Sequence, residues 1–326
     1  MAFLFKSKRS PAEAVQKLQA GFDELEAGNE KGIEHTARQL AVMKQMIVGD
    51  GEHEPKKDEI CNLCTLICKN SRVLESIVLE FESLEFEAKK DAVLVFNTCM
   101  RAEVERVDIG LEYMRKHFHV IEHMILNYNN SEVALGFGSM IRESCRFQYT
   151  NKRLLHSPAF DLLFDHIEAP LFDVSSDAFQ TFKELLTRNR IVVADFLKTQ
   201  YITFFTKYKR LLLSENYVPR RQSLKLLGEL LLDSKNMDVM MRYISDTENL
   251  KLIMNLLRDP SKAIQFEAFH VFKVFVANPE KPREIEDILR SNKEKLIDFL
   301  SNFLVEKDDQ QFIEEKGLVK EEISKL

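Results

Sequence analysis

Apolar residues recur every three or four positions along most of this chain, most clearly between Tyr217 and Pro279. One series is Leu224, Leu227 and Leu231, and a second is Ile264, Ala268, Val271, Phe272 and Phe275. This spacing is typical of amphipathic α-helices, whereas half-buried strands alternate apolar and polar residues. Further apolar residues lie off these stripes, so we expect neighbours to pack against each helix on more than one side.

Related helical segments recur along the chain at nearly constant intervals. Their small residues align at Ala92, Ala134, Ala178, Ser223 and Ala268, which are 42, 44, 45 and 45 residues apart. A helical period of about 40 to 47 residues is typical of armadillo and HEAT repeats. We therefore expect an all-α fold, a right-handed α-solenoid of armadillo/HEAT-like repeats with a long concave surface. An ordinary large helical bundle is the alternative.

Capping and breaking residues mark where these helices begin and end. Ser10, Pro11 and Glu13 predict a helix start, and Gly49 ends a helix expected over residues 31–48. A polar loop is expected over 50–57. Later helices are expected over 58–69, 71–82, 86–101, 106–117, 119–128, 131–146, 174–188, 191–198, 199–213, 283–290 and 292–305. The charged tail 306–326 has apolar residues at helical spacing and predicts an end cap. Because no segment resembles a linker, we expect a single domain over 1–326 with capping helices at both ends.

Composition narrows the range of functions. The chain has 326 residues, no Trp, 24 Phe and a net charge of −6, which does not favour broad binding to nucleic-acid phosphates. It shows no secretory signal pattern and no apolar run near the roughly 18 residues that a membrane span needs. The five cysteines lie in or beside helical patterns, which indicates reduced thiols and a cytoplasmic protein.

One short motif could bind zinc. His119, Glu122 and His123 match H-x-x-E-H, in which two histidines bind the metal and the glutamate acts as a base. Such a motif arises often by chance, and the sequence indicates no third ligand. We therefore favour a polar helix face over a zinc hydrolase.

Three cysteines share one predicted helix face. Cys61, Cys64 and Cys68 could contribute to a metal site, but zinc sites of this type need a second ligand pair, and none follows. Small cysteines packed into the core are the favoured interpretation. The chain also lacks nucleotide-loop, calcium-loop and nucleophile signatures, so we expect no enzyme activity and no cofactor.

The repeat spacing offers one candidate peptide site. Phe172 and Tyr217 are 45 residues apart, which gives them the same register in adjacent repeats, and Arg221 lies about one helical turn beyond Tyr217. Two aromatics with a cation beside them would suit a short peptide that carries aromatic side chains and a carboxylate. From spacing alone, the favoured interpretation is that both aromatics pack into the core and that Arg221 is an ordinary surface charge.

Long motifs make the chain similar to a known family. NYVPRRQSLKLLGELLLD, NLKLIMNLLRDPSKAIQFEAFHVFKVFVANP and SDAFQTFKELLTR closely resemble the Mo-twenty-five family, also named calcium-binding protein thirty-nine. FLFKSK, FEAKKDAVLVFN and GFGSMIRESCR fit as well, so the resemblance covers essentially the whole chain. It implies a non-catalytic armadillo/HEAT-like scaffold that binds kinases or pseudokinases of the sterile-twenty class and favours their active conformation.

The resemblance also implies a binding site for the partner's C-terminal tail, which ends in a Trp-Glu-Phe-type sequence. The tail-binding positions correspond to Phe172, Tyr217, Arg221, Lys251 and Met254. The aromatics and Met254 would line an apolar slot, while Arg221 and Lys251 would pair with carboxylates.

Three positions depart from the family pattern. At the rim of the tail pocket, this chain has Ser291 where the family has a lysine. At two kinase-facing positions, it has Ser234 and Met237 where the family usually has arginine and phenylalanine. These departures affect the expected tail sequence and kinase partner. The sequence thus predicts a scaffold that is monomeric before it binds its kinase, and a general armadillo-type peptide adaptor without kinase activation is the alternative.

Overall fold

The computed structural model describes residues 10–49 and 54–326 of the chain. In this part the fold contains 20 α-helices, one short 3₁₀ helix and a two-stranded hairpin, which confirms the all-α prediction. The opening FLFKSK segment and residues 50–53 of the expected polar loop lie outside the described residues. No helix of the described ranges has the length and apolar character of a membrane span.

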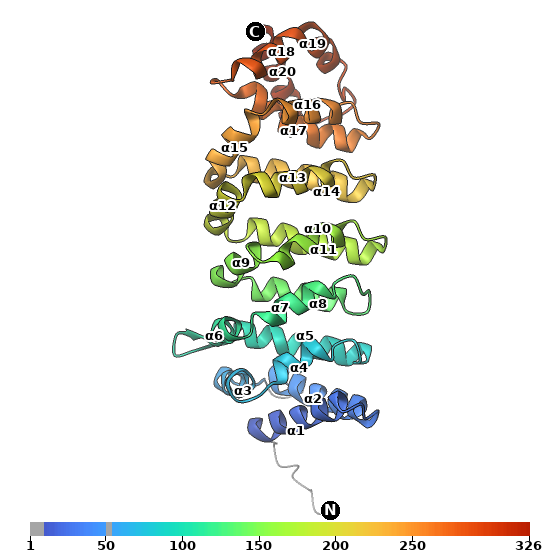
Figure 1. The fold of residues 1–326 in the computed structure, drawn as a ribbon, viewed down its shortest axis with the longest axis vertical. Helices are drawn as coiled ribbons and strands as arrows, with labels where there is room; N and C mark the ends of the chain where they lie inside the picture. The colour runs from blue at the N-terminus through green and yellow to red at the C-terminus, as the bar shows by residue number, and fades with distance from the viewer. Residues whose placement is uncertain (1–9, 50–53) are drawn as a thin grey trace, which may run out of the picture. The chain divides into compact units, whose positions relative to one another are not determined.

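The chain divides into two compact units, which meet in sequence at Val192 and Val193. The expectation of a single domain over 1–326 stays a prediction. In Figure 1 the N-terminal unit runs from blue to green. Its helices are α1 (Pro11–Glu26), α2 (Lys31–Val48), α3 (Lys57–Asn70), α4 (Val73–Leu79), α5 (Phe86–Arg101), α6 (Ile109–Lys116), α7 (His119–Leu126), α8 (Ala134–Ser144), α9 (Gln148–Leu155), α10 (Pro158–Ile167) and α11 (Phe172–Thr187), and its strands are β1 (Glu103–Val104) and β2 (Val107–Asp108).

The C-terminal unit contains the later helices, drawn from yellow to red in Figure 1. The division falls within α12 (Arg190–Thr199). The remaining elements are α13 (Tyr201–Leu212), α14 (Tyr217–Leu232), η1 (Ser234–Asn236), α15 (Met237–Ile244), α16 (Thr247–Leu256), α17 (Lys262–Ala277), α18 (Arg283–Ser291), α19 (Lys293–Ser301) and α20 (Gln310–Ser324). Helix α20 packs on α17 and α19, so the tail is the end cap that its spacing predicts.

The repeat inferred from small residues is present in both units. Ala92, Ala134, Ala178, Ser223 and Ala268 are all fully or almost fully buried, and they lie on α5, α8, α11, α14 and α17. Within the N-terminal unit α2, α5, α8 and α11 pack one on the next, and within the C-terminal unit α14 packs on α17 and α17 on α20. The solenoid class is thereby confirmed: equivalent helices stack so that each repeat buries the apolar face of its neighbour.

Polar side chains one repeat apart also bond to each other across these stacked helices. In the N-terminal unit Asn97 donates a hydrogen bond to Ser139, 42 residues later, at 3.0 Å. In the C-terminal unit Lys273 pairs with Glu315, also 42 residues later, at 2.6 Å. The repeat interval therefore sets polar pairing as well as core packing.

A buried polar cluster joins α8 and α11. Arg142 makes a bidentate pair with Asp177, with N–O distances of 3.0 and 3.1 Å. Arg142 also donates to the Thr181 hydroxyl, and Asp177 also contacts Tyr128. The Tyr128 hydroxyl donates to the Asp177 carboxylate at 2.5 Å. A Cβ at Gly138 would overlap that carboxylate and the Tyr128 hydroxyl, so only glycine fits beside the cluster. The glycine on α8 is thus explained by packing.

Two local features were missed by the sequence pattern. The helix expected over 106–117 begins only at Ile109, because β1 and β2 form a hairpin whose turn residues Glu105 and Arg106 have positive φ angles of 50° and 67°. Helix α9 was not expected. The buried Asn151 on this helix donates a side-chain hydrogen bond to the Leu185 carbonyl oxygen at 3.2 Å, and such a polar core residue gives no apolar stripe.

The placement of the cysteines was only partly correct. Cys64 and Cys68 are buried as expected, but Cys61 is only half-buried and its thiol donates to the Glu103 carbonyl oxygen at 3.4 Å. The difference arises because Cys61 lies on the side of α3 that faces the first residue of β1. The prediction of three core thiols is therefore wrong for Cys61.

Candidate functional site

Four of the five expected tail-binding residues lie on two helices of the C-terminal unit. Tyr217 and Arg221 lie on the first two turns of α14, and Lys251 and Met254 lie on α16. The side chain of Asn216 caps α14, so the helix begins at Tyr217. Both α14 and α16 pack on α17, which holds the two helices against one common support.

The side chains on α14 are available to a ligand. Tyr217 is 42% exposed, and the Arg221 side chain is 46% exposed. The nearest acidic partner of Arg221 is Glu267, at 3.9 Å. Burial raises the pKa of Glu267, and this effect outweighs the opposing influence of Lys225 and Arg221. The long N–O distance leaves the guanidinium donors of Arg221 able to meet an incoming carboxylate.

The side chains on α16 combine a charge with an apolar group. Lys251 is exposed and pairs with Glu248 at 2.8 Å, one turn earlier on the same helix. An exposed pair of this kind contributes little to stability, so a ligand carboxylate can compete with Glu248 for the lysine. Met254 is half-buried, which leaves part of its flexible side chain for contact with an apolar guest.

The fifth expected residue belongs to the N-terminal unit. Phe172 is the first residue of α11, and it is 67% exposed. The core position that spacing alone favoured for this aromatic is therefore wrong. Met237 and Ser234, at the expected kinase-facing positions, are exposed at the start of α15 and in η1, and Ser291 is exposed at the end of α18.

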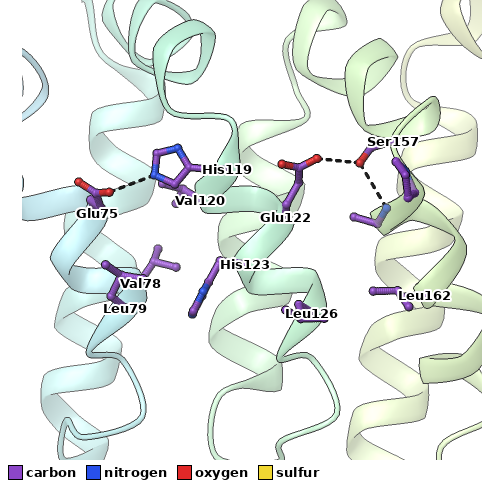
Figure 2. A pocket seen from close by; sticks show the side chains of 12 residues that line it. Glu75, Val78, Leu79, His119, Val120, Glu122, His123, Leu126, Ser157 and Leu162 are labelled. Atoms are coloured by element: carbon purple, nitrogen blue, oxygen red, sulfur yellow. Dashed lines mark hydrogen bonds and ion pairs between the residues drawn. The ribbon is translucent and has the colours of Figure 1, made fainter.

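A second surface feature lies in the N-terminal unit, where α4, α7 and α10 pack side by side. They enclose an open hollow of about 570 Å³. Figure 2 shows that Leu79, Leu126 and Leu162 line one part of it, with His123 between Leu79 and Leu126. Four polar side chains lie along the opposite edge, namely Glu75, His119, Glu122 and Ser157. Leu79 and Leu126 are large apolar side chains that remain exposed. The hollow thus combines an apolar surface with a polar rim.

The rim is formed by two hydrogen-bonded pairs. His119 Nε2 lies 3.0 Å from a Glu75 oxygen, and the Ser157 hydroxyl donates to Glu122 at 2.9 Å (Figure 2). Burial would raise the pKa of Glu75, but the bond to His119 and the charge of Arg72 outweigh it and leave that pKa lowered. His123 lies one turn after His119 on α7, and burial lowers the pKa of its imidazole.

The possible metal ligands differ from those of the sequence motif. Among the described residues, the one group of three potential ligands whose atoms all lie within 4.8 Å of one another is Glu75, His117 and His119. Only His119 comes from the H-x-x-E-H motif. Glu122 bonds to Ser157 instead, and His123 lies outside this group. The arrangement expected for a zinc hydrolase is therefore not assembled.

Comparison with known proteins places the chain in a family. Residues 3–326 match the Mo25-like family. The chain belongs to that family. The calcium-binding protein 39-like protein of Homo sapiens is 43% identical over 330 residues, covering 100% of this chain and 98% of the relative. The Mo25-like protein of Schizosaccharomyces pombe is 44% identical over 330 residues, covering 100% of both. The degreening-related gene dee76 protein of Auxenochlorella protothecoides is 42% identical over 315 residues, covering 96% of this chain and 98% of the relative.

Membership of the Mo25-like family accords with the resemblance inferred from the long motifs.

The hollow on α4, α7 and α10 was not predicted from the sequence. Glu75 and His117 received no role in the sequence analysis. A signal was nevertheless present, because Glu75 precedes His119 by 44 residues, one repeat interval. A search for ligand-type residues one repeat apart would have found this pair.

Proposed function

We propose that this Mo25-like protein is a non-catalytic scaffold that binds a kinase or pseudokinase of the sterile-twenty class. It holds both the kinase domain and a C-terminal tail that ends in an aromatic-acid-aromatic sequence. The observation that carries the proposal is the pairing of exposed cations with accessible apolar groups on α14 and α16 of the C-terminal unit. The kinase class and the tail motif follow from the family resemblance.

The proposed contacts follow from the chemistry of the exposed groups. Arg221 pairs with a carboxylate of the tail through its planar guanidinium, and Lys251 supplies a second positive charge. Tyr217 and Met254 contact an aromatic side chain of the tail. Aromatic anchors and arginines are the residue types that contribute most to protein interfaces.

The proposed mechanism is a shift between two kinase conformations. A scaffold that binds the active conformation more tightly raises its population by the ratio of the two affinities. Binding of the tail raises the effective concentration of the kinase domain near the scaffold, so the two contacts support each other. No chemical step by this chain is required, and we propose a cytoplasmic protein that is monomeric before it meets its kinase.

A pull-down followed by a kinase assay tests this proposal. Wild-type protein should capture a sterile-twenty-class kinase from native extract, and Arg221→Ala should lose most of it. Adding the wild-type protein to the same kinase, purified free of the scaffold, should raise the activity of the kinase. Capture without any change in activity would instead favour the general peptide adaptor. Capture of no kinase by the wild type would contradict both the partner class and the mechanism.

We propose no calcium-dependent role for this protein, although the name of the human relative mentions calcium binding. Calcium binds six to eight oxygen ligands. The one three-residue cluster of potential ligands in the described ranges offers two imidazoles and a single carboxylate. That donor set does not suit calcium.

A further inference from the structure

We propose that Glu75, His117 and His119 form a surface site for a transition-metal dication of the Zn²⁺ type. The three residues come from separate parts of the N-terminal unit: Glu75 lies on α4, His117 follows α6, and His119 begins α7. The site is distinct from the tail-binding residues and does not depend on the proposed scaffold function.

The geometry brings the three ligand atoms close together. All lie within 4.8 Å of one another, and the His119 nitrogen is 3.0 Å from the Glu75 oxygen. Metal–ligand bonds of about 2.0–2.2 Å in a tetrahedral site place neighbouring ligand atoms about 3.3–3.5 Å apart. The Glu75–His119 pair is already near that separation. The His117 nitrogen lies within 4.8 Å of the other two ligand atoms, so it has to come closer to them by no more than about 1.3 Å to complete three ligands.

The donor types select the class of metal. Two imidazoles and one carboxylate form a ligand set that zinc uses when it keeps a fourth position open. Imidazole also suits copper, nickel and iron, whereas magnesium and calcium prefer oxygen ligands only. The open position of a bound ion would lie beside the hollow, because Glu75 and His119 both line it (Figure 2). Water would occupy that position.

Neighbouring side chains hold two of the ligands in place. Arg72 lies 3.6 Å from the second oxygen of Glu75, which leaves the first oxygen directed at His119. The His117 ring stacks on Tyr113, with centroids 4.3 Å apart and an angle of 10° between the planes. Such outer contacts orient metal ligands and reduce the rearrangement needed on binding. A bound ion would also link α4 to the junction of α6 and α7.

Calorimetric titration of the full chain with ZnCl₂, after chelator treatment, tests the site. We expect one zinc ion per chain. His119→Ala, His117→Ala and Glu75→Gln should each weaken binding by about tenfold or more, since even outer-shell changes cost about 10- to 100-fold. The matched control is His35→Ala, because His35 also pairs with a glutamate, Glu24, at 3.1 Å but lies outside any three-ligand group among the described residues. The affinity of His35→Ala for zinc should stay at the wild-type value. Titration of the wild type with CaCl₂ should show no binding.

A second measurement separates this site from the buried thiols of α3 and α5. Cobalt(II) bound by imidazole and carboxylate absorbs in the visible range without the near-ultraviolet charge-transfer band that thiolate ligation produces. His119 is exposed and Glu75→Gln preserves the side-chain shape, so these two variants should fold, as circular dichroism would verify. Absence of zinc binding by the wild type, unchanged affinity in both folded variants, or a thiolate band that accounts for the bound cobalt would each overturn the proposal.

Discussion

The interface of α8 with α11 and that of α14 with α17 stand at equivalent places in the repeat, yet they use arginine differently. In the N-terminal unit the Arg142 side chain is only 14% exposed and makes two hydrogen bonds to the buried Asp177. In the C-terminal unit the Arg221 side chain is 46% exposed, and its nearest carboxylate is 3.9 Å away. The first arginine is part of the structure, and the second is available to a ligand.

This comparison shows that the repeat does not determine what a cation does. A buried, bidentate pair has already lost its hydration, and removing one partner leaves the other uncompensated. An exposed cation keeps its hydration until a ligand replaces the water, so its contribution appears in binding and little in folding. The proposed function depends on Arg221 being an exposed cation of this second kind.

The largest effect should come from the aromatic core that supports α14. Phe272 on α17 is fully buried, and Phe272→Ala should lower the free energy of unfolding by about 3 to 5 kcal/mol. Chemical denaturation measures this loss. Phe172→Ala is the matched control, because that ring is largely exposed, and it should change stability by no more than about 0.5 kcal/mol. A loss below about 1 kcal/mol for Phe272→Ala would show that the core is placed wrongly.

The buried pair of the N-terminal unit should give the next largest effect. Asp177→Ala leaves Arg142 without its carboxylate and should cost about 3 kcal/mol of unfolding free energy. Glu248→Ala, which removes the exposed carboxylate beside Lys251, should cost much less than Asp177→Ala in the same denaturation experiment. Equal losses for the two variants would remove the distinction between buried and exposed pairs.

The smallest effect on folding should be that of Arg221. Because its side chain is exposed and its ion pair is long, Arg221→Ala should change the free energy of unfolding by about 0.5 kcal/mol or less. Thermal and chemical denaturation of Arg221→Ala and Arg142→Ala, measured side by side, compare the two losses of unfolding free energy directly. If Arg221→Ala destabilised the protein as much as Arg142→Ala, this arginine would be structural and unsuited to the role proposed for it.

Much of the fold could be predicted because the repeat has a strong sequence signal. Small residues such as Ala92 and Ala134 must be buried where helices approach closely, and that constraint recurs at every repeat. The start of α1 was predictable because the Ser10 side chain accepts a hydrogen bond from the Glu13 backbone. By contrast, the hairpin before α6 depends on two residues in a left-handed conformation, which an apolar pattern does not reveal.

The candidate sites were predictable to different degrees. The exposure of Phe172 and Arg221 fits the roles that spacing and family resemblance suggested, although spacing alone favoured a core position for Phe172. The cluster around His119 could not be inferred from its own helix. The two other potential ligands lie on α4 and directly after α6, and only the stacking of helices brings them near His119. Short motifs read along one helix miss such sites.

The most direct test of the central claim is the affinity of a labelled peptide that ends in Trp-Glu-Phe, measured by fluorescence anisotropy. Arg221→Ala and Met254→Ala should each weaken binding by on the order of 2 kcal/mol, which corresponds to roughly thirtyfold in Kd. Added salt should reduce the contribution of Arg221 and leave that of Met254 unchanged.

Two matched variants complete this measurement. Lys262→Ala removes an exposed cation that pairs with Glu306, and Met237→Ala removes an exposed methionine outside the tail-binding set. Both should bind the peptide as the wild type does. Wild-type affinity in folded Arg221→Ala and Met254→Ala would contradict the account, because the tail would then bind elsewhere on the protein.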